Sequence, residues 1–485
     1  MSDFKKPKKF DRNMIVIGAG AAGLVTSYIA ATVKASVTLI EGHRMGGDCL
    51  NTGCVPSKSL LRSAGVVHTV RRAREFGLRP MTAEFEFADV MERVQRSVRT
   101  IAPHDSVERY TELGVECISG YARLVSPWEV EVNGTRLSAR SIVIATGARP
   151  AVPPVPGLAN TGFLTSDTVW ELRQKPRRMV VLGGGPIGCE LAQAFARLGV
   201  EITQVEMLPR LLMREDEDVS QLVETRFRSE GIRVLTGHKV VGVDHYGRDK
   251  VVICEHDGRK VKVPCDEILV AVGRTANTDG LGLEELGIAL NPNRTLKVDA
   301  YMRVPNYRHI LACGDVAGPY QFTHVAAHQA WYASVNGLFA GFKKFKVDYS
   351  VIPWCTFSDP EVARVGLNES EAKAQNVAYE VVRYGIDDLD RAIADDDALG
   401  FVKVLTVPGK DRILGVTIVG PHAGELIAEY VLAMKHGLGL NKILGTIHIY
   451  PTLSEANKYA AGEWKKAHKP ERLLKWVERF HRWRL

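Results

Sequence analysis

The chain has 485 residues, of which 45% are hydrophobic and 25% charged, a composition ordinary for a globular protein of about two to four domains. The net charge of +7 lies at the ends, +3 over residues 1–12 and +5 over residues 463–485, so the body is near neutral and a basic surface for nucleic acid is not indicated. No signal peptide or membrane-spanning run is present, and eight cysteines do not form a disulfide scaffold, so we expect a cytoplasmic protein.

Two segments repeat a pattern of apolar strand, glycine turn, helix and second strand. In residues 14–41 the turn has the spacing G-x-G-x-x-G at Gly18, Gly20 and Gly23, and the second strand ends at Glu41. In residues 179–206 the same spacing is formed by Gly183, Gly185 and Gly188, with Glu206 at the equivalent place. Such glycines admit a pyrophosphate to a helix N-terminus, and the glutamate accepts from ribose hydroxyls. The sequence therefore predicts two dinucleotide-binding sites.

Between these repeats lies the segment GGDCLNTGCVPSK, residues 46–58. Cys49 and Cys54 are five positions apart at a predicted helix start, where the thiol pKa is lowered. Lys58 follows Cys54 by one helical turn, on the same face. The remaining cysteines stand in mostly apolar surroundings and are predicted to be buried thiols: Cys117, Cys189, Cys254, Cys265, Cys313 and Cys355.

Further strands continue the α/β pattern. A buried strand in residues 141–150 ends in a turn at Thr146 and Gly147, and a proline-rich crossover follows. Another apolar strand ends at Gly314 and Asp315. After about residue 347, strand-like runs precede a helical run over residues 423–437, which indicates an α+β domain.

The ordered motifs GAGAAG, GGDCLNTGCVPSK, ATG, GGGPIGCE, VGRTANT, CGDV and HIYPTLSEA resemble those of the pyridine nucleotide–disulfide oxidoreductases, in the branch of dihydrolipoamide dehydrogenase and mercuric reductase. The resemblance implies an α/β homodimer with Rossmann-like FAD and NAD domains and a C-terminal α+β dimerisation domain that completes the partner's active site. The expected boundaries are 1–150 and 276–347 for FAD, 151–275 for NAD(P), 348–470 for the interface, and 471–485 for a basic amphipathic helix.

The resemblance also implies residue roles. Cys49 and Cys54 form the disulfide of the oxidised enzyme, with Cys49 exchanging with substrate and Cys54 facing the flavin. Lys58 lies near the flavin and pairs with Glu190. Glu41 binds the FAD adenosine ribose and Asp315 the ribitol chain. The expected cofactor-binding residues are Gly18, Gly20, Gly23, Glu41, Gly47, Thr146, Gly147, Gly183, Gly185, Gly188, Glu206, Gly273, Gly314 and Asp315.

The second glycine turn, with Glu206 at the end of its second strand, favours NADH over NADPH. The carboxylate of Glu206 accepts from a 2′-hydroxyl and repels a 2′-phosphate. Arg210 lies four residues after Glu206 and could pair with a 2′-phosphate, so NADP(H) stays an alternative cofactor. Pro186 stands where many family members carry a tyrosine that shields the flavin, so that gate is absent or built from another residue.

The chain departs from the family pattern near its C-terminus. Members that handle dithiols carry a histidine base before the proline of this motif, and a glutamate that orients it. Here Tyr450 precedes the proline and Glu455 remains, but a tyrosine is a poor base at neutral pH. Mercuric reductases resemble this chain in that tyrosine, yet carry a C-terminal cysteine pair, whereas no cysteine follows Cys355. His448 is either a displaced base or a structural histidine.

The tail after residue 470 has apolar residues at helical spacing and a basic opposite face. One interpretation is a helix docked on the interface domain. The other is a docking helix for an acidic partner or a membrane surface.

The sequence thus predicts an FAD enzyme that passes electrons from NADH through the flavin to a Cys49–Cys54 disulfide, with no resident metal. The acceptor is a small disulfide or a soft metal ion, as in mercuric reductase. Dihydrolipoamide dehydrogenase is the first alternative. A redox-sensing flavoprotein that acts through a partner is the second.

Overall fold

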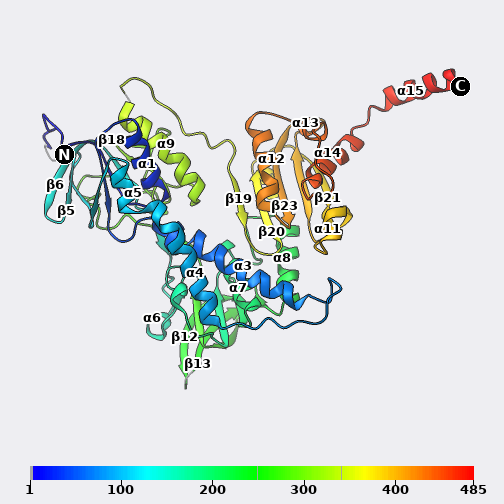
Figure 1. Cartoon of the computed structure of the whole chain (residues 1–485), viewed down its shortest axis with the longest axis horizontal. Coiled ribbons are helices and arrows are strands. Elements are labelled where there is room, and N and C mark those ends of the chain that lie inside the picture. Colours follow the sequence, from blue (N-terminus) through cyan, green and yellow to red (C-terminus); the bar gives the residue numbers. More distant parts are fainter. Residues whose placement is uncertain (1–3, 248, 340) are drawn as a thin grey trace. The chain divides into compact units, whose positions relative to one another are not determined.

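The computed structural model describes residues 4–247, 249–339 and 341–485 (Figure 1). The chain forms two compact units. The first comprises the described residues of Met1–His68, Ala83–Met207 and His238–Asp348, and the second comprises Thr69–Thr82, Leu208–Gly237 and those of Tyr349–Leu485.

The first unit contains a sheet with the strand order β17-β18-β6-β1-β2-β3. Its strands are β1 (Arg12–Ile17), β2 (Val37–Glu41), β3 (Val115–Ser119), β6 (Thr135–Ile144), β17 (Arg303–Val304) and β18 (Tyr307–Ala312). β1 pairs in parallel with β2 and β6, and its residues Met14–Ile17 are buried, as expected of a central strand in a covered parallel sheet. The helices α1 (Ala21–Thr32) and α9 (Thr323–Phe339) pack on this sheet and on each other.

A second parallel ladder in this unit joins β8 (Leu164–Thr165), β15 (Glu267–Val270), β9 (Arg178–Leu182) and β10 (Glu201–Val205), and α7 (Pro186–Arg197) follows β9. Two antiparallel groups accompany it. They are β12 (Lys239–Tyr246), β13 (Asp249–His256) and β14 (Arg259–Cys265), and the pair of β7 (Ala148–Pro150) with β16 (Arg274–Ala276).

The other elements of the first unit are α2 (Gly47–Asn51), α3 (Cys54–Arg71), α4 (Phe87–Ile101), η1 (Ala102–Asp105), α5 (Val107–Glu112), β4 (Arg123–Ser126), β5 (Glu129–Val132), α6 (Leu158–Thr161) and η2 (Val169–Glu171). The end of α3, from Thr69 on, belongs to the second unit.

The second unit is built on an antiparallel sheet with the order β19-β20-β23-β22-β21. Its strands are β19 (Pro353–Thr356), β20 (Glu361–Gly366), β21 (Glu380–Gly385), β22 (Phe401–Thr406) and β23 (Ile413–Gly420). The unit also contains α8 (Glu217–Ser229), β11 (Arg233–Leu235), α10 (Glu369–Ala374), η3 (Ile386–Asp388), α11 (Asp390–Ala394), α12 (Ala423–Lys435), α13 (Leu440–Leu444), α14 (Glu455–Ala467) and α15 (Glu471–Arg484).

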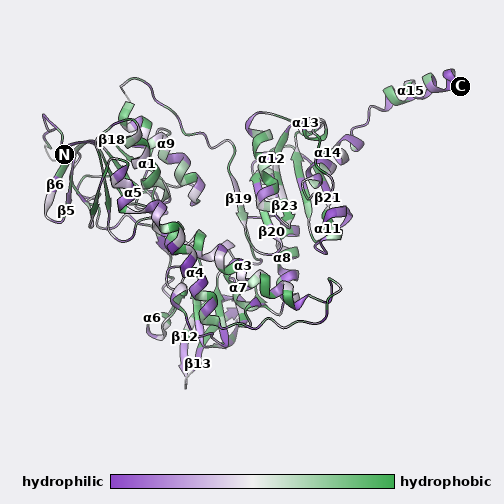
Figure 2. Cartoon of the chain, viewed as in Figure 1, coloured by the Kyte–Doolittle hydropathy of each residue, from purple (hydrophilic) through white to green (hydrophobic). Residues whose placement is uncertain are grey.

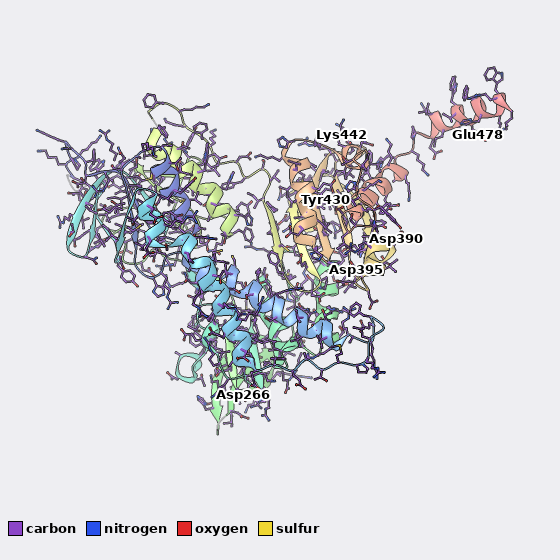
Figure 3. All side chains as sticks on the ribbon, in the orientation of Figure 1. Asp266, Asp390, Asp395, Tyr430, Lys442 and Glu478 are labelled. Carbon is purple, nitrogen blue, oxygen red and sulfur yellow. The ribbon has the colours of Figure 1, made fainter. Side chains whose placement is uncertain are left out.

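One apolar stripe of α12 holds this unit's core together. Ala423, Ile427 and Tyr430 lie on one helical face and are buried against the sheet. The hydroxyl of Tyr430, labelled in Figure 3, donates to the carbonyl of Asn457 at 3.3 Å. This bond joins α12 to α14, which packs on β21 and β22.

The tail helix departs from one of its two predicted arrangements. Every side chain from Lys469 to Leu485 is exposed, so α15 is not docked on the interface domain. Pro470 explains the separation, because a proline has no N–H with which to continue α14. Figure 2 shows hydrophilic and hydrophobic residues alternating along α15. In the described ranges, no helix combines the length and the apolarity that crossing a membrane requires.

The predicted α/β class with a C-terminal dimerisation domain is confirmed. The burial predicted for the six remaining cysteines is correct for Cys189, Cys254, Cys265 and Cys313. It is wrong for Cys117 and Cys355, which are half-buried. Both lie on edge strands, β3 and β19, each of which has a neighbouring strand on one side only among the described strands.

Candidate active site

The first glycine turn links β1 to α1. Gly18 has φ +102°, and a Cβ there would lie 2.4 Å from the carbonyl oxygen of Ala145. A Cβ on Gly23 would lie 1.7 Å from the oxygen of Gly18. In contrast, a Cβ on Gly20 would meet only the Cα of Gly47, at 3.9 Å, among the described residues. The outer glycines are therefore needed for the fold itself, and the middle one leaves backbone open to a ligand.

Glu41 closes this turn. Its Oε2 accepts from the backbone N–H of Ala19 at 2.6 Å, and its Oε1 accepts from that of His43 at 2.7 Å. These bonds fix the carboxylate at the carboxyl end of β2. Each oxygen keeps a lone pair that a ribose hydroxyl can reach.

Asp315 lies just after β18. Burial raises the pKa of this carboxyl group to about 6. In the part of the chain that the structure describes, the nearest cationic atom is Nε of Arg274, 3.7 Å from Oδ2, and that buried nitrogen has no hydrogen-bond partner. Nη2 of Arg274 donates to the carbonyl of Ala148 at 2.7 Å and not to Asp315, so this partly buried carboxyl group suits a ligand rich in hydroxyl and phosphate groups. Together with Glu41 and the first turn, this group fits FAD.

The second glycine turn links β9 to α7 and repeats the first. Gly183 has φ +115°, and a Cβ there would lie 2.3 Å from the oxygen of Ala271. A Cβ on Gly188 would lie 2.2 Å from the oxygen of Gly183, whereas one on Gly185 would have no heavy atom within 4 Å among the described residues. Glu206 accepts from the backbone N–H of Gly184 at 2.5 Å. The same steric division thus marks a second dinucleotide-binding turn.

The cysteine pair lies at the junction of two helices, with Cys49 inside α2 and Cys54 as the first residue of α3. Both are present as thiols and hydrogen-bond to each other. That bond, the hydroxyl of Thr323 at 3.3 Å and the charge of Lys58 lower the pKa of Cys54 to about 6. The same bond and burial raise the pKa of Cys49. The lowered pKa expected for the pair therefore applies to Cys54 alone, because the two sulfurs share one proton.

Lys58 faces two anionic groups. Its Nζ lies 2.8 Å from Oε2 of Glu190, a carboxylate on α7 that is 7% exposed. The lysine also lies close enough to Cys54, one turn back along α3, to lower its pKa. A buried carboxylate requires such a cationic partner.

In the second unit, Tyr450 is 65% exposed and donates to Oδ2 of Asp390 at 2.9 Å. This hydrogen bond raises the pKa of the phenol. Glu455 is buried at the start of α14, where it accepts from the N–H of Thr452 at 3.2 Å and the hydroxyl of Tyr459 at 3.4 Å. The carboxylate that engages the tyrosine is therefore Asp390, which carries one of the labels in Figure 3.

His448 lies two residues before the tyrosine but is engaged elsewhere. Its Nδ1 lies 3.0 Å from the carbonyl oxygen of Thr446, and its Nε2 lies 3.0 Å from Oε1 of Glu429. Both neighbours are acceptors. Each ring nitrogen of His448 therefore already has a hydrogen-bond partner within the second unit.

Residues 12–330 match the family model of the pyridine nucleotide-disulphide oxidoreductases, and residues 352–461 match the dimerisation domain of the same family. The chain belongs to this family. Its relatives include a mercuric reductase of Lysinibacillus sphaericus, 35% identical over 93% of this chain and 82% of that protein. A dihydrolipoyl dehydrogenase of Chlamydia muridarum is 35% identical over 91% of this chain and 94% of that protein.

The chain is also similar to solved structures of flavoprotein disulfide reductases. The HOCl-induced flavoprotein disulfide reductase RclA from Escherichia coli, in a Cu(II) complex, has a TM-score of 0.83 and 27% identity over 94% of this chain and 99% of that chain. As a pyridine nucleotide–disulfide oxidoreductase, the protein is an enzyme that uses FAD and NAD(P)H. Its dimerisation domain supports a homodimer.

The remaining residues predicted to bind cofactors in this oxidoreductase lie in turns or at the ends of strands and helices. Thr146 donates to the carbonyl of Asn277 at 2.7 Å, and the N–H of Gly314 donates to Gln329 at 2.7 Å. Gly47, Gly147 and Gly273 all have positive φ.

Sequence reasoning missed four partners of the predicted residues: Thr323, Arg274, Asp390 and Glu429. Only Arg274 carried a signal, because it lies in the VGRTANT motif. Each of the others comes from a segment remote in sequence or from a helix with no motif of its own.

Proposed function

We propose that the protein is an NADH-dependent reductase whose Cys49–Cys54 pair delivers electrons to a small disulfide or a soft metal ion. Bound FAD supplies two-electron transfer between the nicotinamide and this disulfide. The two glycine turns support FAD on residues 1–150 and 276–347 and NAD(H) on residues 151–275. The observation that carries the choice of acceptor is Tyr450, whose phenol donates to Asp390.

The dithiol provides its own proton transfer. In the reduced pair the thiol of Cys49 donates to the sulfur of Cys54. Movement of that proton to Cys54 makes Cys49 a thiolate without an outside base. Cys49 then attacks the acceptor disulfide, and the first sulfur leaves as a thiolate that takes the proton from Cys54. The Cys54 thiolate then attacks the Cys49 sulfur, which releases the second sulfur as a thiolate and reforms the Cys49–Cys54 disulfide.

The opposite direction needs a base outside the pair. A dithiol substrate must lose a proton before it can attack the enzyme's disulfide. Tyr450 is unsuited to this step, because its hydrogen bond to Asp390 raises the pKa of the phenol. His448 is held at both nitrogens. Disulfides and soft metal ions carry no such proton, so the site supports reduction.

A metal-ion substrate would reach the thiols directly. Mercuric reductase is the name of one relative, and soft ions bind thiolates strongly. No cysteine follows Cys355 in this sequence, so residues 356–485 offer no thiol that could pass the ion to the Cys49–Cys54 pair. We therefore expect slower turnover with Hg²⁺ than with a small disulfide.

The decisive experiment compares NADH oxidation with glutathione disulfide, lipoamide and Hg²⁺ as acceptors. The proposal predicts faster reduction of a small disulfide or metal ion than oxidation of dihydrolipoamide in the reverse assay. Dihydrolipoamide oxidation as the fastest reaction would overturn it and favour dihydrolipoamide dehydrogenase, the second candidate, whose named relative is equally similar at 35% identity.

The variant Tyr450→His tests the reason for this preference. A histidine base should raise dihydrolipoamide oxidation by about tenfold or more, which corresponds to roughly 1.4 kcal/mol of barrier. Tyr450→Phe is the matched control, since it removes the same hydroxyl without adding a base, and it should give no gain. An unchanged rate in Tyr450→His would mean that the missing base does not limit this reaction.

A further inference from the structure

The tail helix α15 lies outside the part of the chain that matches the family, which ends at residue 461. Neither glycine turn nor the cysteine pair uses it. Each of its side chains is exposed, including Trp483 at 81%. A 14-residue helix in water is only marginally stable by itself, so its apolar face requires a surface to cover it.

The two faces of α15 are chemically distinct. At 100° per residue, the apolar face is formed by Leu473, Trp476, Val477, Phe480 and Trp483, all exposed. The opposite face carries Arg472, Lys475, Arg479 and Arg482 with Glu471 and Glu478, while Arg484, in the last turn, lies on the apolar side with its guanidinium carbon 5.6 Å from the centre of the Phe480 ring. Residues 471–485 hold five basic and two acidic side chains, a net charge of +3.

The tryptophans lie at the border between these faces. Arg472 and Arg479 each precede a tryptophan, Trp476 and Trp483, by four residues, so each arginine lies beside an indole on the helix surface. Phe480, which has no polar atom, lies at the centre of the apolar face. A membrane surface has polar headgroups above apolar acyl chains. The helix has the same order, with indole N–H and guanidinium groups at the border and a phenyl ring at the centre of the apolar face.

We propose that α15 binds an anionic membrane surface, with its apolar face in the headgroup–acyl boundary and its basic face toward lipid phosphates. The net charge of +3 is complementary to such a surface and not to a neutral one. A single short helix gives weak, reversible binding. In a homodimer two copies act together, and the second binding event becomes intramolecular.

The test is co-sedimentation of the full-length, FAD-loaded protein with vesicles. One set is phosphatidylcholine alone, and the other is equal parts of phosphatidylcholine and phosphatidylglycerol. The proposal predicts binding to the anionic vesicles alone, weakened by salt. The double substitution Trp476→Ala with Phe480→Ala leaves the charge unchanged and should weaken binding by about tenfold or more. Arg472→Gln with Arg479→Gln should do the same.

Two controls make the result specific. Phe342→Ala removes a 93% exposed aromatic ring outside the helix and should leave vesicle binding unchanged. Glu478→Gln removes one negative charge from the polar face and should strengthen binding. NADH oxidation and FAD content verify that each variant is folded.

Several outcomes would overturn the proposal. They are no vesicle binding, equal binding to both vesicle types, or binding that survives both double substitutions. A vesicle-independent change in oligomeric state on losing Trp476 and Phe480 would instead identify a second copy of the chain as the occupant.

Discussion

Thr323 at the start of α9 should set the acidity of the cysteine pair. Its hydroxyl lies 3.3 Å from Sγ of Cys54, and it donates when that sulfur is a thiolate. A hydrogen bond to a charged group contributes about 1.5–3 kcal/mol, and 1.36 kcal/mol corresponds to one pKa unit. A sulfur acceptor at this distance belongs at the weak end. Thr323→Val should therefore raise the pKa of Cys54 from about 6 by about one unit.

The assay is the pH dependence of iodoacetamide alkylation of the reduced protein, with the modified cysteine identified by mass spectrometry. The sign follows from the bond: removing a donor to the thiolate favours the thiol, so the alkylation profile moves to higher pH. Thr52→Val is the matched control, because that hydroxyl donates to Asp48 at 2.8 Å and not to a sulfur. An unmoved profile, or equal movement in both variants, would refute the reasoning.

Three further predictions concern cofactor specificity and stability. Gly185→Ala should fold and lose NADH binding, whereas Gly183→Ala should also lose stability, because its Cβ would lie 2.3 Å from a carbonyl oxygen; thermal unfolding with NADH titration distinguishes them. Glu206→Gln should shift the ratio of kcat/KM for NADH over NADPH toward NADPH by about tenfold, and an unchanged ratio would remove the carboxylate from specificity. Lys403, 2% exposed, lies 2.8 Å from Asp216. Burial alone would raise the pKa of Asp216, but the hydrogen bond from Lys403 and two backbone amides hold it below its usual range. That stabilisation is complete above the unfolded-state pKa and is lost as the pH falls through the folded one. Lys403→Met should destabilise the second unit by about 3–5 kcal/mol at neutral pH, with a smaller loss in acid; an unchanged urea midpoint would contradict this.

The parts of the site that are local in sequence could be predicted. The glycine turns depend on contacts within one strand–turn–helix unit, so spacing alone located Gly18, Gly183 and the two glutamates. The pairing of Lys58 with Glu190 required the family pattern, since α3 and α7 are remote in sequence.

The remaining features depend on side-chain geometry that no local pattern encodes. The opposite pKa shifts of Cys49 and Cys54 arise from the direction of one shared hydrogen bond. Asp390 reaches Tyr450 from a helix 60 residues away in sequence. The exposure of α15 likewise depends on the interruption at Pro470, whereas its periodicity alone fitted a docked helix equally well.

Lys58 has one positive charge and, in the reduced protein, two anions that compete for it. Oxidation to the disulfide removes the thiolate of Cys54, whereas the ion pair of the ammonium group with Glu190 remains. Since Glu190 is on α7, which opens the second dinucleotide fold, the oxidation state of the sulfurs is thermodynamically linked to that helix. Linkage is reciprocal, so a dinucleotide that repositions α7 must shift the midpoint potential of the cysteine pair, and a measured potential has meaning only at a stated nucleotide occupancy.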